Sequence, residues 1–397
     1  MNQKPLRILM VLHMPWNANL GGPQTQMNLA DEFKKLGHIV EKFDYYDAFP
    51  EAKWLPSKLL RLFDLIFFDF SARAKSFIQK NAHRFDIIDA HQGNLPFSKK
   101  ELGFNGLVVA RSAGLYAFHQ EFALREDKIS KTHTDSNPIK CLLQKIYRIK
   151  KERDGNKYIP SLNMADAIIV LNEDEETYIN EVLNLGEKCI ALPNGLTNEK
   201  HKALSQFSQT SDLRLMNKQI VFIGSWSPGK GSRDWTKILQ MVKRQVPEVS
   251  FLFLGTGTTP ERVLNDLELS SFCDWVTIIP NYENEELPNL LSNSTIGVFP
   301  SHVEGFGIAV LEKLSSGLPT VAYDIPGPRV MLRHIDNSLL IPLGNTQQMS
   351  NKIVELLNLD RVRYSELSAR CVEAAQLFCW SDISKKTLNF YQQQMEH

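Results

Sequence analysis

The sequence has few cysteines, and they form no recognisable pattern. The five are odd in number, without a C-x-x-C pair or a nearby histidine pair: Cys141, Cys189, Cys273, Cys371 and Cys379. The odd number and irregular spacing of these cysteines argue against a disulfide framework and against a structural zinc site. A reducing compartment suits such a chain, so we expect a cytoplasmic protein.

An excess of charge of one sign and long apolar runs are also absent. Lysine plus arginine and aspartate plus glutamate both number 45 in the 397 residues, so no net field draws the protein to nucleic acid. No stretch approaches the roughly 20 apolar residues that a membrane-spanning helix requires. The first apolar run, LRILMVLHM, resembles a strand more than a signal peptide. We therefore expect no nucleic-acid partner.

Short apolar runs alternate with amphipathic segments along the sequence, which is typical of parallel sheets covered by helices. The polar, turn-rich residues 197–217 interrupt this alternation and predict a linker. The predicted domains are therefore 1–196 and 218–378, followed by a C-terminal helix in 379–397. The predicted strands are 6–12, 86–90, 107–110, 167–171, 188–192, 219–224, 250–255, 275–279, 295–299, 320–323 and 339–341.

Loops that follow strands are the places to look for chemistry, because open parallel sheets bind ligands beyond the carboxyl ends of their strands. The loop NLGGPQ places Gly21 and Gly22 before a predicted helix. Glycines let backbone N–H groups approach an anion at a helix N-terminus. A glycine pair in this place is more often only a turn, so the motif is weak by itself.

The loop GSWSPGKG opens the second half of the chain. Gly224, Gly229 and Lys230 match the G-x-x-x-x-G-K of NTPase P-loops, but Gly231 occupies the place of the magnesium-binding Ser or Thr. The neighbouring strand VSFLFLG also ends without an aspartate to hold magnesium. Lys230 either neutralises a diphosphate or is an ordinary solvated lysine in a turn.

The loop PSHVEGFGIAVLE carries the most specific motif. Glu304 lies in the loop, and Glu312 follows within an otherwise apolar helix. A carboxylate on such a helix is costly to bury without partners, and ribose hydroxyls would serve. Gly305 and Gly307 leave N–H groups bare at the helix start, where a phosphate or sugar oxygen is well bound.

The segment PSHVEGFGIAVLEKLSSGLPTVAYDIPGPRVML, residues 300–332, resembles the retaining glycosyltransferases of family 4, whose signature is two glutamates separated by seven residues. The family also has a glycine pair in the first loop, PNG at the linker entry (193–195 here) and a lysine–glycine pair in the loop that holds Lys230. The resemblance spans nearly the whole chain. It implies the GT-B fold: two Rossmann-like α/β domains facing a central cleft, the C-terminal helix packing on the N-terminal domain.

The resemblance also implies roles for individual residues. Glu304 and Lys230 would be the catalytic residues, with Lys230 neutralising the diphosphate of the donor. Glu312 would bind the ribose, and Glu304 would hold the donor sugar. The remaining implied donor-binding residues are Gly22, Gly224, Arg233, Gly305, Phe306, Gly307 and Ile308.

The implied reaction is transfer of a sugar from a nucleoside-diphosphate sugar to an acceptor hydroxyl, with retention of the anomeric configuration. The N-terminal domain would bind the acceptor, a saccharide or lipid-linked saccharide, in the synthesis of cell-surface polysaccharide or another glycoconjugate. The sequence contains no D-x-D triplet, which favours a metal-independent reaction. We expect no cofactor and no metal site.

Two positions depart from the family pattern. Ser225 replaces an arginine that pairs with the diphosphate in relatives, and Arg233 is the candidate to replace it. Ala113 replaces a histidine of many relatives, so Arg111 and His119 become candidates for the donor or acceptor cleft. Two alternatives stay open: a phosphoryl-transfer NTPase that uses GSWSPGKG, and a degenerate protein that binds a nucleotide sugar without turnover.

Residues 138–157, PIKCLLQKIYRIKKERDGNK, form a basic amphipathic pattern, and the upstream residues 57–77 are dense in Leu, Ile and Phe. Ordinary helices that face the core have such patterns. The alternative is peripheral docking of the protein to the cytoplasmic face of an anionic membrane.

Overall fold

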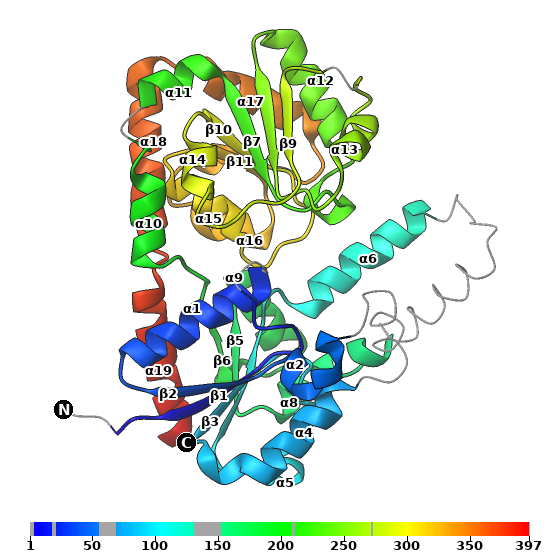
Figure 1. Cartoon of the computed structure of the whole chain (residues 1–397), viewed down its shortest axis with the longest axis vertical. Helices are drawn as coiled ribbons and strands as arrows, with labels where there is room; N and C mark the ends of the chain where they lie inside the picture. Colours follow the sequence, from blue (N-terminus) through cyan, green and yellow to red (C-terminus); the bar gives the residue numbers. More distant parts are fainter. Residues whose placement is uncertain are drawn as a thin grey trace. The chain divides into compact units, whose positions relative to one another are not determined.

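The computed structural model describes residues 4–17, 21–54, 69–130, 152–208, 211–270 and 273–396 (Figure 1). The chain divides into two compact units. The first comprises Met1–Leu192 and Ile383–His397, and the second comprises Pro193–Asp382. Each unit is built on a six-stranded sheet in which all neighbouring strands are parallel.

The sheet of the first unit has the strand order β2-β1-β3-β4-β5-β6. The strand order reverses between β1 and β3, which is the kind of position where such sheets bind ligands. Both central strands β3 and β4 are buried along their whole length. The bounds are β1 Arg7–Val11, β2 Ile39–Phe43, β3 Ile87–His91, β4 Leu107–Arg111, β5 Ala167–Val170 and β6 Cys189–Ala191.

Helices cover the first sheet, and two of them begin at residues whose side chains cap the N-terminus of the helix. The side chain of Asp69 caps α4, and a capping box of Ser98 and Glu101 starts α5. The helices are α1 Gly21–Lys35, α2 Tyr45–Ala48, η1 Pro50–Lys53, α4 Phe70–Asn81, η2 Ala82–Arg84, α5 Lys99–Leu102, α6 Tyr116–Ser130, α8 Tyr158–Met164, α9 Glu173–Thr177, η3 Tyr178–Val182 and η4 Gly186–Lys188.

The C-terminal helix α19, Trp380–Glu396, packs on the sheet of the first unit (Figure 1). The ring of Tyr391 lies 6.0 Å from that of Phe33 on α1, and its hydroxyl accepts a hydrogen bond from Arg111 at 2.9 Å. The same hydroxyl donates to Asp89 on β3. The last helix of the chain therefore completes the core of its first unit.

The sheet of the second unit has the order β12-β11-β10-β7-β8-β9. Its strands are β7 Gln219–Ile223, β8 Ser250–Leu254, β9 Val276–Ile279, β10 Ile296–Phe299, β11 Thr320–Tyr323 and β12 Leu340–Ile341. The helices are α10 Asn198–Ser205, α11 Ser211–Asn217, η6 Pro228–Lys230, α12 Trp235–Gln245, α13 Pro260–Asp266, α14 Leu287–Leu291, α15 Ile308–Ser315, α16 Pro326–Leu332, η7 Asn337–Leu339, α17 Thr346–Leu357 and α18 Arg361–Gln376.

The predicted class, two Rossmann-like parallel-sheet domains, is confirmed, and each predicted strand segment overlaps an observed strand, with bounds that differ by at most one residue. The predicted linker 197–217 is different: it forms α10 and α11, which belong to the second unit. Thr197 caps α10, while Arg214 on α11 is buried and donates to the carbonyl of Ser292 at 3.0 Å. These short helices each bury few residues, so their sequence lacks visible periodicity.

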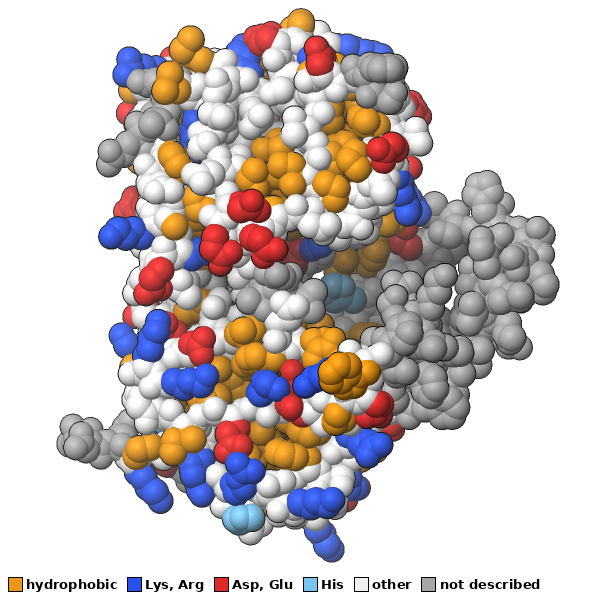
Figure 2. All heavy atoms as spheres, in the orientation of Figure 1, with side chains coloured by type: hydrophobic (Ala, Val, Ile, Leu, Met, Phe, Trp, Pro, Cys, Tyr) orange, Lys and Arg blue, Asp and Glu red, His pale blue; other side chains and the backbone are white. Residues whose placement is uncertain are grey.

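The face of the molecule drawn in Figure 2 carries side chains of both charges, interspersed over both units. Among the residues that the structure describes, no helix is long and apolar enough to cross a membrane. The basic amphipathic pattern falls mainly on residues 138–151, and the apolar segment mainly on 57–68; both stretches lie outside the described residues.

Candidate active site

Two loops of the second unit are joined at the carboxyl end of its sheet: the loop after β7 and the loop after β10. The carbonyl of Gly229 accepts hydrogen bonds from the hydroxyl of Ser301 and from the backbone N–H of His302, both at 2.9 Å. The backbones also approach closely at Gly231, where an added Cβ would lie 2.1 Å from the carbonyl oxygen of Pro300. Gly231 has a φ of +80°, so both its conformation and its surroundings require glycine.

Lys230 and Glu304, predicted from separate motifs, form an ion pair across these two loops. Both side chains are partly exposed, at 30% and 19% respectively, so a ligand can reach the pair. The Lys230 ammonium also lies 5.6 Å from the centre of the Phe299 ring, at the end of β10. The structure therefore places the predicted cation and the predicted loop carboxylate in one site.

A second link between the loops was not predicted from the sequence. His302 contacts Asp234 through Nε2 at 2.8 Å, and the hydroxyl of the buried Tyr323 donates to the same carboxylate oxygen at 2.7 Å. The three residues come from the loops after β10 and β7 and from β11. The three residues lie far apart in the sequence, so no local sequence pattern predicts this contact.

The helix α15 begins beside Glu304. Its N-cap, Gly307, has a φ of +92° and contributes no side-chain capping bond, so the first turn keeps N–H groups that can bind an anion. The backbone of Gly327 approaches this turn and donates to the carbonyl of Glu304 at 3.2 Å. Gly305 and Phe306, which we predicted to bind the donor through their N–H groups, are buried within the same loop.

Glu312 lies on α15 with 5% of its surface exposed, and its carboxylate pairs with Lys200 at 2.9 Å. Lys200 comes from α10, within the stretch that we predicted to be a linker. The Lys200 ammonium also donates to Asn284 at 3.4 Å. Burial, with a contribution from the charge of Glu312, raises the pKa of Tyr282 far above its ordinary value. Glu312, which we predicted to need a partner when buried, is therefore paired with a lysine.

Lys313, the next residue, is completely buried, and no sequence motif singled it out. Its ammonium donates to the carbonyl of Val298 at 3.0 Å and lies 5.0 Å from the centre of the Phe299 ring. Gly297 makes room for the lysine stem, because a Cβ there would lie 2.6 Å from Cδ of Lys313. The pKa of Lys313 is lowered to about 7, mainly by burial; the charge of Glu312 opposes this shift, and the charge of Lys230 adds to it.

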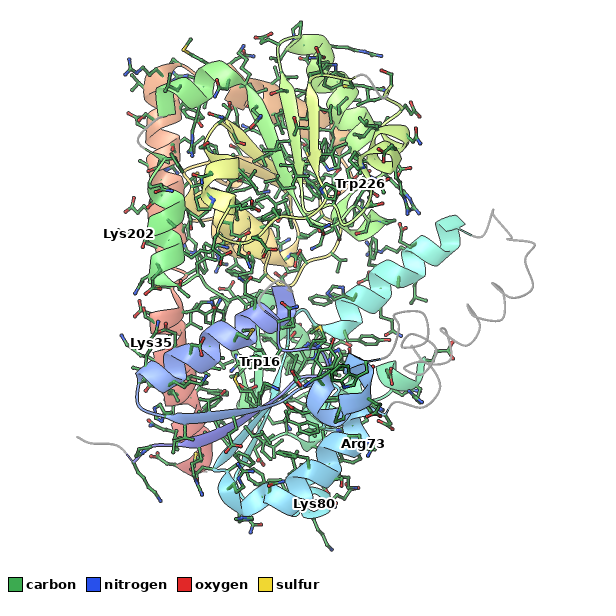
Figure 3. All side chains as sticks on the ribbon, in the orientation of Figure 1. Trp16, Lys35, Arg73, Lys80, Lys202 and Trp226 are labelled. Atoms are coloured by element: carbon green, nitrogen blue, oxygen red, sulfur yellow. The ribbon has the colours of Figure 1, made fainter. Side chains whose placement is uncertain are left out.

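The remaining predicted residues of the loop after β7 have different surroundings. Gly224, with a φ of +152°, ends the strand. Ser225 and Arg233 are exposed, and Trp226 between them is buried and donates to Asp266 at 2.9 Å (Figure 3). Trp226 therefore anchors the loop to α13. Ile308, the first residue of α15, is half-buried.

The first unit holds the other predicted residues. Gly22 lies in the first turn of α1, which begins at Gly21, rather than before the helix as predicted. His119 and Ala113 are exposed. Arg111, a candidate for the cleft, lies instead in the core.

The guanidinium of Arg111 pairs with Asp89 at 2.7 Å and donates to the hydroxyl of Tyr391. Burial lowers the pKa of Arg111, but the charge of Asp89 outweighs it, and the net shift is upward. All three side chains are almost completely enclosed. The arginine therefore neutralises a buried carboxylate, which explains its presence at the end of β4.

Across the described parts of the chain, no group of three or more His, Cys, Asp or Glu residues is placed to hold a metal ion.

Comparisons with known proteins agree with this architecture. Residues 205–378 match the model of the family Glycosyl transferases group 1. An uncharacterized glycosyltransferase from Haemophilus influenzae is 27% identical over 208 residues, which cover 52% of this chain and 55% of the relative. A D-inositol 3-phosphate glycosyltransferase from Mycobacteroides abscessus is 26% identical over 239 residues, which cover 57% and 52%. The chain thus spans about half the length of these curated relatives.

A solved structure shares the fold over nearly the whole chain. Sucrose-phosphate synthase from Thermosynechococcus elongatus superposes with a TM-score of 0.71 at 17% identity, covering 98% of both chains. At this identity the likeness concerns the fold alone. The two-sheet architecture is that of GT-B glycosyltransferases, as the sequence predicted. The matched family segment contains Lys230, Glu304 and Glu312.

Proposed function

We propose that the protein is a retaining, metal-independent glycosyltransferase that moves a sugar from a nucleoside-diphosphate sugar to an acceptor hydroxyl. The observation that carries this proposal is the joining of Lys230, Glu304 and the start of α15 in one partly exposed site, inside the segment that matches a glycosyltransferase family. The site lies beyond the carboxyl ends of parallel strands, where such folds bind ligands.

The chemistry of sugar transfer needs a stabilised departing diphosphate. The ammonium of Lys230 supplies a full positive charge, and the N-terminus of α15 supplies N–H groups and a favourable dipole. Preorganised groups of this kind stabilise the charge that develops in a transition state. Neither group requires a metal ion, which supports the metal-independent part of the proposal. No cofactor besides the sugar nucleotide is needed.

Two ion pairs of the site support a route by which the donor would bind. Glu304 is held by Lys230, and Glu312 is held by Lys200. A diphosphate that binds Lys230 would replace Glu304 there and free its carboxylate for the hydroxyls of the donor sugar. Glu312 would in turn accept hydrogen bonds from the ribose. Arg233 is exposed on the same loop and is our proposed replacement for the arginine missing at Ser225.

The geometry counts against the NTPase alternative. A P-loop needs a serine or threonine after its lysine to bind magnesium. Here that position is Gly231, where the carbonyl oxygen of Pro300 leaves no space for a side chain. Glycine at this position therefore allows close contact with the loop after β10, and a magnesium-binding hydroxyl does not fit there.

The decisive experiment is a thermal-shift panel of UDP-, GDP- and ADP-sugars with and without EDTA, followed by transfer assays with the donor that binds. A true donor stabilises the protein by mass action, and EDTA should not change the shift. No stabilisation by any of these donors would contradict the proposal. Stabilisation without transfer to any acceptor would favour the degenerate, non-catalytic alternative, and inversion at the anomeric centre would refute the retaining mechanism.

We further propose a cytoplasmic protein that associates peripherally with an anionic membrane and acts on a lipid-linked saccharide in polysaccharide or glycoconjugate synthesis. The support is the basic amphipathic pattern of residues 138–157. Flotation with anionic and neutral vesicles tests it. Binding that is selective for anionic lipid and weakens with salt is expected, and its absence would remove the membrane proposal alone.

A further inference from the structure

Lys313 places a buried amine next to the candidate active site. Its nitrogen lies near the end of β10, because it donates to the carbonyl of Val298 at 3.0 Å, and its side chain is completely enclosed. Gly297 on the same strand leaves room for the lysine stem. An ammonium is costly to bury, and lysine is almost never fully buried unless it is paired. One carbonyl oxygen compensates a full charge poorly, so the position of this lysine needs an explanation.

Lys313 and Lys230 contact the same aromatic ring. Their Nζ atoms lie 5.0 Å and 5.6 Å from the centre of the Phe299 ring, so the two nitrogens are no farther apart than the sum of these distances. Lys230 is partly exposed, whereas Lys313 is enclosed. A ligand that binds Lys230 therefore does not touch Lys313, but its charge acts on Lys313 through a protein interior that screens weakly.

The charges of the site leave a role for this second cation. Glu304 pairs with Lys230, and Glu312 pairs with Lys200. Each of these pairs is neutral by itself, so an anionic diphosphate brings negative charge that the pairs do not balance. In the described structure Lys313 forms no ion pair of its own, although the charge of Glu312 acts on it. A proton on Lys313 would supply a compensating positive charge.

We propose that Lys313 is a positioning residue that takes up a proton from solvent when an anionic donor binds beside Lys230. Donor affinity should therefore rise as the pH falls through the neutral range. This role rests on the proposed glycosyltransferase function, because that function supplies the anionic ligand. Lys313 acts through the electrostatics of the site and contacts neither the donor nor the reacting atoms.

The direction of the effect follows from the charge of the ligand. The pKa of Lys313 is about 7, lowered mainly by burial, so near neutral pH only part of the molecules carries the proton. A diphosphate near Lys230 favours the charged form of Lys313 and raises its pKa. By linkage, protons then favour the donor-bound state to the same extent. The effect disappears well above neutral pH, where Lys313 is uncharged in both states.

Other titratable groups pack around α15 and β10. Burial raises the pKa of Tyr323 on β11, and of Tyr364 and Cys371 on α18, far above neutrality. Burial lowers the pKa of His201 on α10, so this ring stays uncharged near neutral pH. His302, in the loop after β10, needs a control because histidines in general titrate near neutral pH.

Isothermal titration calorimetry on the full chain measures the proton uptake directly. The probes are UDP-glucose, GDP-mannose and ADP-glucose, whose diphosphates have no group that titrates near neutral pH. Titration at pH 7.5 in two buffers of different ionisation enthalpy gives the number of protons taken up. We expect net uptake, and binding about three- to tenfold tighter at pH 6 than at pH 8.5.

The outcomes separate this inference from the proposed function. Binding without proton uptake and with equal affinity at both pH values would overturn the inference and leave the transferase proposal intact. Binding of none of the three probes would contradict the proposed function and this inference with it.

Three variants assign the proton. Lys313→Met keeps the length of the side chain without its charge, and it should abolish the uptake and the pH dependence of donor affinity. Lys202→Met, at an exposed position of α10, and His302→Asn should both retain the uptake. Uptake that persists in Lys313→Met, or that is lost in His302→Asn, would overturn the assignment to Lys313. A purely structural role of Lys313 would change affinity by the same factor at every pH, which would also overturn it.

Discussion

Lys230 and Glu304 are separated by 74 positions in the sequence and form one ion pair in the fold. Each was predicted from its own motif, but their contact was not, because it depends on the packing of two loops. The same holds for Glu312, whose need for a partner was predicted while Lys200 was not. At the scale of residues, sequence motifs identify the chemical groups, and tertiary packing decides which groups meet.

Lys230→Met should lower kcat/KM for transfer by about 10²- to 10³-fold, because it removes the charge that we propose stabilises the departing diphosphate. Lys202→Met is the matched control, since Lys202 is exposed on α10 of the same unit (Figure 3). Steady-state kinetics with the donor found by thermal shift measures both variants. Near-normal transfer by Lys230→Met would contradict the site.

Lys313 gives a pH-dependent prediction for stability. Its pKa is about 7 in the folded protein and 10.5 ordinarily, so between these values the unfolded chain binds the extra proton. Its contribution therefore becomes more favourable as pH rises from about 7 to about 10, and the full burial cost applies below about 7.

Lys313→Met should accordingly raise the melting temperature of the second unit more at pH 6 than at pH 9, relative to wild type. Calorimetry at the two pH values gives the comparison. The exposed Lys202→Met should show no such difference. An equal effect of Lys313→Met at both pH values would show that the buried amine does not titrate in this range.

The loop after β7 illustrates how one element is shaped by another. Gly231 was first notable as a mismatch to the P-loop pattern. The structure explains the glycine by its positive φ and by the carbonyl of Pro300, on a different loop. A local sequence pattern contains no information about such an approach, so the reason for the glycine was not predictable from the sequence.

Gly231→Ser should destabilise the second unit by clearly more than the ~1–2 kcal/mol that a left-handed conformation costs by itself. Gly344→Ser is the control, because Gly344 also has a positive φ, +77°, but nothing lies within 4 Å of its added Cβ. Chemical denaturation compares the two. Magnesium-dependent NTP hydrolysis gained by Gly231→Ser would revive the P-loop alternative.

Strands were predicted more completely than the elements around them. Their apolar runs are continuous because parallel strands are buried on both faces. β2, Ile39–Phe43, was missed because it is an edge strand with Glu41 and Lys42 inside it. The helices α10 and α11 were missed because their burial depends on α14, α15 and α18 rather than on a wide apolar face. Those contacts are made by residues far away in the sequence.

At the scale of the whole molecule, a substitution in the core of the first unit should destabilise that unit and leave the stability of the second unit unchanged. Tyr391→Phe removes a hydroxyl that pairs with both Asp89 and Arg111. Leaving these buried charged groups less satisfied should cost about 1–3 kcal/mol in the first unit. Hydrogen exchange should show faster opening of β3 and β4, with the second unit unchanged.

Tyr46→Phe on α2 is the control for this substitution, because Tyr46 belongs to the same unit and is only half-buried. Exchange that accelerates equally in both units would mean that the units open together. Unchanged exchange in β3 and β4 would mean that the Tyr391 hydroxyl contributes nothing to the buried cluster.

The position of α19 also determines when each unit can be completed as the chain is synthesised. The second unit is continuous from Pro193 to Asp382, whereas the first needs Ile383–His397 in addition to its own 192 residues. Domains usually fold in the order in which the ribosome produces them. Here the first unit stays without Tyr391, the partner of its buried Arg111–Asp89 pair, until the second has been produced. The unit that is made second is therefore the first that can reach its final packing.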